Sequence, residues 1–206
     1  MDPFVVSIVG LKKSGKTTVA SALIAALSAR GYRVAALKST HLRRLSLDPR
    51  GVDSFRLAEA GALFLAARSR EETMSLLRGP QPDSLEDLVA LVPPSMQIVV
   101  VEGSVGGLRS GVVLCLREAD QLEETLRVRG VRPAELIALS GVFAADPRAS
   151  AALRPAGSEG LPPVDNVLIA GEREALCERV LAAAGHPAPA VEPAGPLALD
   201  PSWHPE

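Results

Sequence analysis

The chain has 206 residues, a length that fits one globular domain with a short tail. Hydrophobic residues make up 47% of it and aromatic residues only 3%, which favours an aliphatic core of helices packed on a parallel sheet. The net charge of −2 argues against bulk electrostatic binding to nucleic acid or to an anionic membrane. The sequence has no apolar run of roughly 18 to 20 residues and no signal-peptide pattern, so we expect a cytoplasmic protein.

The first 37 residues predict a strand, a glycine-rich loop, a helix and a second strand. The first strand covers residues 4–9, and the helix runs from 16 to about 30, where apolar residues recur at helical spacing and Gly31 follows as a stop signal. The second strand covers residues 32–37. This order is the setting in which phosphate-binding loops occur.

The rest of the chain continues to alternate between strands and helices. After a polar loop at 38–52, we expect a short helix from 53 or 54 to about 61, strands at 63–67 and 73–77, a helix at 84–91, strands at 98–101 and 112–116, a helix at 119–128, strands at 135–139 and 166–169, and a helix at 172–184. Residues 186–206 are rich in proline and predict a disordered tail.

The two cysteines, Cys115 and Cys177, are far apart in the sequence and lie in apolar surroundings. Free cysteine behaves as a small hydrophobic residue and is often buried. We therefore interpret both as core residues in a reducing compartment, in preference to a disulfide or a metal site.

The loop after the first strand reads Gly-Leu-Lys-Lys-Ser-Gly-Lys-Thr over residues 10–17, which matches the phosphate-binding (P-loop) pattern at every defined position. Its glycines allow successive backbone N–H groups to face a phosphate, and the helix start adds positive charge. Lys16 would reach the β- and γ-phosphates, and the Thr17 hydroxyl would ligate Mg²⁺. The bland alternative is a glycine-rich turn with a solvent-exposed lysine. We expect nucleotide contacts from Gly10, Lys12, Lys13, Ser14, Gly15, Lys16, Thr17 and Thr18.

This motif in a strand–helix alternation predicts an α/β protein with the three-layer P-loop NTPase fold, a mostly parallel sheet flanked by helices. We assign residues 1–185 to this nucleotide-binding domain and 186–206 to the tail.

A carboxylate is needed on the metal side of such a site, and Glu102 is the best candidate because it ends the most hydrophobic strand. In parallel α/β sheets the ligand crevice lies at the carboxyl ends of the strands. Glu102 and the glycine loop would therefore face the same crevice. The alternative is a loop glutamate that ligates nothing. We predict Thr17 and Glu102 as metal residues, and Lys16, Glu102 and Asp53 as catalytic residues.

A further group of polar residues follows the second strand: Lys38, His41, Asp48, Asp53 and Arg56. Lys38 and His41 come at the carboxyl end of that strand, on the crevice side. His41, Asp48 and Asp53 could position a water, a metal or a second phosphate-bearing ligand. Alternatively, Asp53 and Ser54 cap a helix and His41 lies on the surface.

Taken together, these segments resemble the molybdopterin-guanine dinucleotide biosynthesis protein B (MobB) family. The resemblance covers residues 4 to about 117 and is carried by the loop 10–18, Lys38-x-Thr40-His41, the stretch 48–62 with its Asp53-Ser54-x-Arg56 core, and 101–103. Two positions depart from the family pattern: residues 104–107 replace a usual Phe-Lys, with Arg109 as the nearest cation, and Ser39 stands where members carry histidine.

The resemblance implies a homodimeric GTP-binding protein with weak Mg²⁺-dependent hydrolysis, which assists the guanylyltransferase that attaches GMP to molybdopterin. It assigns Lys16, Thr17 and Glu102 to the nucleotide and Mg²⁺, and the segment from His41 to Arg56 to a crevice near the dimer interface.

Two other functions fit the loop. A small P-loop kinase would transfer a γ-phosphoryl group to a metabolite and close an arginine-bearing lid, for which Arg127 and Arg129 are candidates. A nucleotide-switched adaptor would bind nucleotide without significant catalysis. Guanine preference rests on the resemblance, since the chain has no Asn-Lys-x-Asp base-reading motif.

Overall fold

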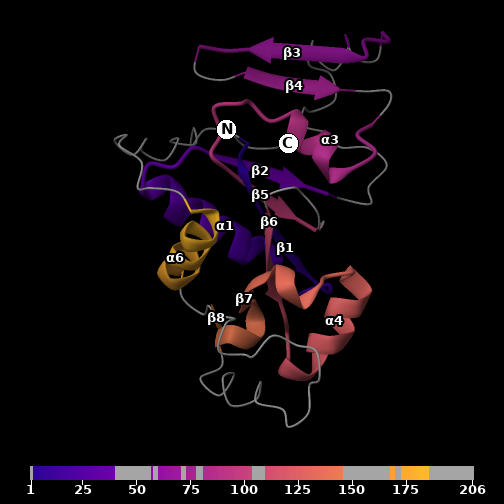
Figure 1. The fold of residues 1–206 in the computed structure, drawn as a ribbon. Helices are drawn as coiled ribbons and strands as arrows, with labels where there is room; N and C mark the ends of the chain where they lie inside the picture. The colour runs from indigo at the N-terminus through magenta and orange to yellow at the C-terminus, as the bar shows by residue number, and fades with distance from the viewer. Residues whose placement is uncertain are drawn as a thin grey trace, which may run out of the picture. The chain divides into compact units, whose positions relative to one another are not determined.

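The computed structural model describes residues 2–39, 57, 60–70, 73–77, 81–103, 110–145, 168–169 and 173–185. These residues fall into two compact units (Figure 1). One contains the strands β3 (Phe64–Arg68) and β4 (Thr73–Leu77), and the other contains every other element described below.

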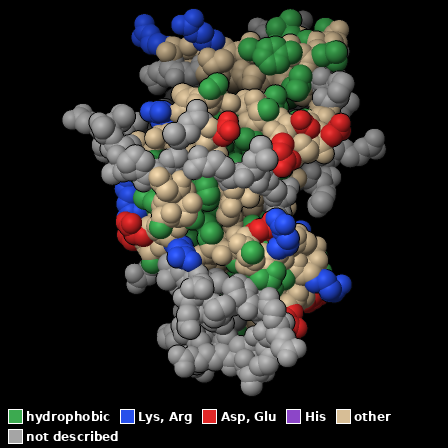
Figure 2. All heavy atoms as spheres, viewed as in Figure 1, with side chains coloured by type: hydrophobic (Ala, Val, Ile, Leu, Met, Phe, Trp, Pro, Cys, Tyr) green, Lys and Arg blue, Asp and Glu red, His purple; other side chains and the backbone are tan. Residues whose placement is uncertain are grey.

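The smaller unit is a two-stranded antiparallel sheet, in which Phe64 lies opposite Leu77. Both side chains are exposed, Phe64 to 63%. Figure 2 shows hydrophobic side chains gathered over this hairpin on the face in view. The two strands match the prediction from the sequence. An isolated hairpin is only marginally stable in water, and this one leaves an apolar pair exposed.

The larger unit is built on a six-stranded sheet with the order β2-β5-β1-β6-β7-β8. Every neighbouring pair in this sheet is parallel. The central strand β1 therefore has β5 on one side and β6 on the other, and all three end at the same edge. The strands are β1 (Phe4–Gly10), β2 (Val34–Lys38), β5 (Ile98–Glu102), β6 (Ser110–Cys115), β7 (Leu136–Ser140) and β8 (Leu168–Ile169).

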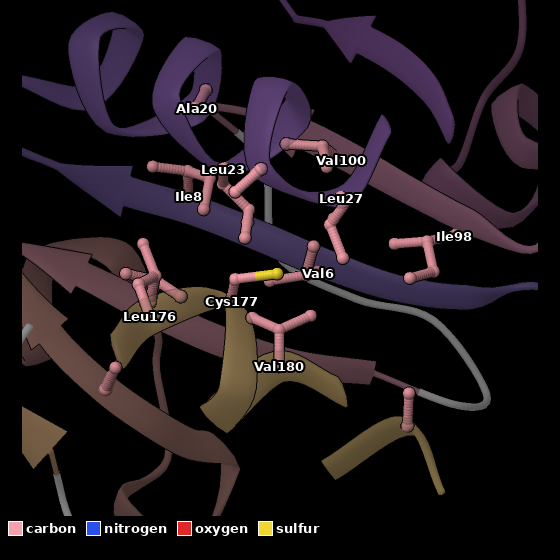
Figure 3. Packing of buried hydrophobic residues seen from close by; sticks show 14 of the residues in the cluster. Val6, Ile8, Ala20, Leu23, Leu27, Ile98, Val100, Leu176, Cys177 and Val180 are labelled. Atoms are coloured by element: carbon pink, nitrogen blue, oxygen red, sulfur yellow. The ribbon is translucent and has the colours of Figure 1, made fainter. Parts of the chain in front are cut away.

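Helices cover both faces of this sheet, which gives the three-layer α/β fold expected from the sequence. Alternate residues of a strand point to opposite faces, and β1 follows this rule. Val6 and Ile8 pack with Leu23 of α1 (Lys16–Ala29) and Val180 of α6 (Arg173–Ala184), as Figure 3 shows. Val5 faces α3 (Leu85–Ala90), and Val9 faces α4 (Leu122–Arg129).

The predicted elements agree with the structure to within two or three residues. The largest difference is at α4, which was expected to begin at 119 and begins at Leu122, because a 3₁₀ turn occupies Ala119–Gln121. No residue of this turn is buried, whereas Leu122 is. Cys115 and Cys177 are free and buried, as expected. Most of the short helix expected from 53 to 61, and all of the tail 186–206, lie outside the described residues.

A turn after β7 supports the glycine loop that follows β1. The Val142 N–H donates a hydrogen bond to the Ser14 carbonyl (3.2 Å), and the Phe143 N–H donates one to the Leu116 carbonyl (3.1 Å). Gly141 reaches this position with φ +97°, and a Cβ there would collide with the Ser14 carbonyl and lie 2.9 Å from the Leu116 nitrogen. Only glycine fits so close to two other backbone segments.

We predict that Gly141→Ala lowers the free energy of unfolding by about 2 to 5 kcal/mol, since it combines left-handed strain with a backbone collision. Gly130→Ala is the matched control, because Gly130 also has a positive φ (+64°) but has nothing within 4 Å of an added Cβ. It should cost only about 1 to 2 kcal/mol. Urea denaturation of both variants measures their free energies of unfolding. Equal losses would show that the close contact between the turn and the loop does not contribute to the cost of the substitution.

Candidate functional site: the loop between β1 and α1

The loop 10–15 has the tight backbone that the sequence motif requires. A Cβ on Gly10 would collide with the Cys115 carbonyl of neighbouring β6. Gly15 precedes α1 in a left-handed conformation (φ +86°), and Lys13 is the one non-glycine residue among those described with a positive φ (65°). Backbone strain of this kind persists where surrounding structure imposes it and is concentrated at functional sites.

The side chains of the loop are organised around the Leu11 carbonyl. The Lys16 ammonium donates a hydrogen bond to this oxygen at 2.7 Å, and the Ser14 hydroxyl donates another at 2.9 Å. Burial, and secondarily the charge of Arg129, lowers the pKa of Lys16. The ammonium is thus held over the loop as a partly desolvated donor, which strengthens its attraction for an anion.

Thr17 and Glu102 meet at the same edge of the sheet. The Thr17 hydroxyl donates a hydrogen bond to Glu102 Oε1 at 2.8 Å, while Lys38 Nζ lies 3.3 Å from Glu102 Oε2. Parallel pairing explains the meeting, because the β1–β5 register sets Ile8 beside Glu102 and the β2–β5 register sets Lys38 beside it. The Glu102 side chain is only 15% exposed.

The Thr17–Glu102 pair fits a magnesium ion by its chemistry. Both side chains offer oxygen, the ligand that Mg²⁺ prefers, and one or two protein ligands suffice where phosphates and waters complete the shell. The described residues contain no cluster of three or more His, Cys, Asp or Glu side chains. A dedicated all-protein metal site is therefore not found in the part of the chain that the structure describes.

The buried Cys115 borders the loop but has no role as a nucleophile at neutral pH. Burial raises the pKa of its thiol to about 12. The thiol therefore stays protonated, and the thiolate is the reactive form. Its carbonyl, which stands against Gly10, is the part of the residue that shapes the loop.

The structure brings together the predicted nucleotide-binding residues and Glu102. From the sequence, their proximity was expected only because parallel strands end at the same edge of a sheet. The other predicted residues, His41, Asp48, Asp53 and Arg56, lie outside the described residues, as does Arg109. The turn at Gly141–Val142 was missed. Its sequence signal is a Ser-Gly pair directly after a strand that ends at the same edge.

Arg127 and Arg129, the lid candidates of the kinase hypothesis, belong to the last turn of α4. That helix packs against the sheet through Leu122 and Leu126. The helix α4 is therefore part of the folded core.

In the described residues, no helix has the length and apolar character needed to cross a membrane.

Comparison with known proteins places this site in a family. The family model for molybdopterin guanine dinucleotide synthesis protein B matches residues 5–127, which contain the loop 10–17 and Glu102. The chain is 35% identical over 97 residues to a molybdopterin-guanine dinucleotide biosynthesis adapter protein of Haemophilus influenzae, covering 47% of this chain and 54% of that one. It is 34% identical over 94 residues to the Escherichia coli protein of the same description, covering 44% and 53%.

The chain thus spans about half the length of the curated relatives that it matches. Among solved structures, a molybdopterin-guanine biosynthesis protein B (MobB) superposes with a TM-score of 0.56 over 89% of this chain and 100% of that one. At 18% identity this likeness shows the fold alone. Since the family model covers more than half of the sequence, including the loop and Glu102, the chain belongs to the MobB family.

Proposed function

We propose that this protein binds GTP with Mg²⁺ at the loop 10–17, hydrolyses it slowly, and assists the biosynthesis of molybdopterin guanine dinucleotide. The observation that carries the proposal is the Thr17–Glu102 contact beside Lys16. This contact places a hydroxyl and a carboxylate at one edge of the sheet, close to an ammonium group that can bind phosphate. Backbone N–H groups at a helix start supply the remaining attraction for the phosphates.

The residues from Lys12 to Thr18 would bind the nucleotide in different ways. Lys16 would turn from the Leu11 carbonyl to the β- and γ-phosphates, and Ser14, Gly15 and Thr18 would offer backbone N–H groups. Thr17 and Glu102 would hold Mg²⁺, which neutralises phosphate charge when bound. Lys12 and Lys13 are exposed and would add positive charge beside the phosphates.

The pathway assignment is supported by the relatives, which are described as adapter proteins of molybdopterin-guanine dinucleotide biosynthesis. An adapter acts with another enzyme, and we propose a molybdopterin guanylyltransferase as that partner. The preference for guanine rests on family membership. A kinase function has less support, because the arginines proposed for its lid belong to a helix packed on the sheet, although the charge of Arg129 reaches Lys16.

A homodimer is also part of the proposal, and the hairpin β3–β4 is the surface that supports it. The exposed pair Phe64–Leu77 offers an apolar patch, and a two-stranded sheet gains stability when a further strand or surface covers it. A second copy would bring the same hairpin, as a two-fold interface requires.

The first test of nucleotide binding is Lys16→Ala, with Arg33→Ala as control. Removing the ammonium should weaken GTP binding by at least about tenfold, since hydrogen bonds to charged groups contribute roughly 1.5 to 3 kcal/mol. Arg33 is an exposed cation at the amino end of β2, and its loss should leave the affinity within about twofold. Isothermal titration calorimetry measures both. Equal affinities in all three proteins would contradict the assignment of the loop.

Glu102→Gln tests the metal side, because it removes a charge and keeps the shape. Nucleotide should still bind through the loop, but the gain in affinity that Mg²⁺ brings should shrink, and turnover should fall by roughly a hundred- to a thousandfold. Glu135→Gln is the control: this glutamate pairs with Arg132 ahead of β7, at the opposite edge. Titrating GTP with and without Mg²⁺ separates the effects. An unchanged Mg²⁺ dependence in Glu102→Gln would remove Glu102 from the metal site.

The dimer is tested by Phe64→Asp. A buried charge at a two-fold interface is repeated in both copies, so the variant should sediment as a monomer while the native chain sediments as a dimer. Leu91→Asp is the control, since Leu91 is a comparably exposed apolar residue outside the hairpin. A native chain that sediments as a monomer at micromolar concentration would refute the dimer, and a dimer in both variants would place its interface elsewhere.

A further inference from the structure

The side chain of Val142 is exposed beside the glycine loop although its backbone is fixed. The valine is 55% exposed, and it opens a 3₁₀ turn, Val142–Ala145, whose next residue, Phe143, is buried. A Cβ placed on Gly15 would lie 3.6 Å from Val142 Cγ2, so the side chain stands within van der Waals reach of the start of α1. An apolar group held this close to a phosphate loop is available to a ligand seated there.

The strand order predicts how a bound nucleotide would be oriented on the loop. Thr17, Glu102 and Lys38 meet where α1, β5 and β2 come together, on one side of β1. A metal ion held by Thr17 and Glu102 would neutralise the charge of the terminal phosphates, so this side would correspond to the γ-phosphate end. Val142 follows β7, which lies on the other side of β1, beyond β6. The α-phosphate and the nucleoside attached to it would therefore extend toward the β6–β7 side.

We propose that Val142 is the apolar contact for the nucleoside, the ribose or base, of the nucleotide in the loop. This inference rests on the nucleotide binding proposed above and adds a residue that distinguishes a nucleotide from a bare phosphate chain. Contact with a nucleoside would remove the exposed part of the Val142 side chain from water. The contact does not depend on which base is bound, and it contributes to the binding of nucleotides but not of a bare phosphate chain.

The side chain of Val142 is separable from the structural role of the turn. The hydrogen bond to Ser14 comes from the Val142 N–H, and the close approach to Leu116 comes from Gly141. Val142→Ala keeps the N–H and removes only two methyl groups. The effect of Val142→Ala on ligand affinity can therefore be measured while the hydrogen bond that supports the loop is kept.

The experiment compares two probes, GTP and inorganic tripolyphosphate, each with Mg²⁺, by titration calorimetry on the full chain. Covering two half-exposed methyl groups corresponds to about a three- to fivefold gain in affinity, at roughly 0.8 kcal/mol for each fully buried group. Val142→Ala should weaken GTP binding by that factor and leave tripolyphosphate binding within about twofold. Val128→Ala, an equally exposed valine on α4 (52%), should change neither.

The outcomes separate this inference from the proposal beneath it. A native chain that binds neither GTP nor tripolyphosphate contradicts nucleotide binding itself. A native chain that binds GTP, with Val142→Ala at the same GTP affinity or with GTP and tripolyphosphate weakened equally, overturns the nucleoside contact alone. A loss of GTP affinity in Val142→Ala that is absent for tripolyphosphate and absent in Val128→Ala supports it.

Discussion

The parallel pairing of β1 with β5 sets the positions of the residues in the candidate site. Because the two strands run in the same direction and in register, Ile8 lies beside Glu102, and the chain leaves both strands at the same edge of the sheet. The loop from β1 must then turn into α1 next to the carboxylate that ends β5. The 2.8 Å bond from Thr17 to Glu102 follows from this register. A shift of one residue would turn Glu102 to the other face of the sheet.

The loop also depends on contacts from β6 and from the turn after β7, which restrict the path of its backbone. The Cys115 carbonyl leaves room only for glycine at position 10, and the turn at Gly141 meets the Ser14 carbonyl. These contacts come from segments more than a hundred residues away in the chain. They lie against the loop in which Lys13 and Gly15 adopt a positive φ and the Lys16 ammonium bonds to the Leu11 carbonyl. A preformed loop binds with a smaller loss of conformational entropy than a flexible one.

Local patterns in the sequence predicted much of this structure. The aliphatic run 98–101 and the motif 10–17 gave the strand, the loop and the helix start, because each pattern depends on neighbouring residues. The place of Glu102 followed from a general property of parallel sheets. The Lys38–Glu102 ion pair and the Gly141 turn could not be derived in the same way, since strand order is a tertiary property. The start of α4 was placed three residues early because a 3₁₀ turn and an α-helix share the same local signals.

We propose that the loop between β1 and α1 holds the phosphates of GTP beside a magnesium ion at Thr17 and Glu102. Amide chemical shifts of the ¹⁵N-labelled chain, followed while a non-hydrolysable GTP analogue and Mg²⁺ are added, test it most directly. We expect the largest shifts at the amides of residues 13–18, with smaller ones at Glu102–Gly103 that appear only when Mg²⁺ is present. Saturable binding that leaves the amides of 13–18 unchanged would contradict it.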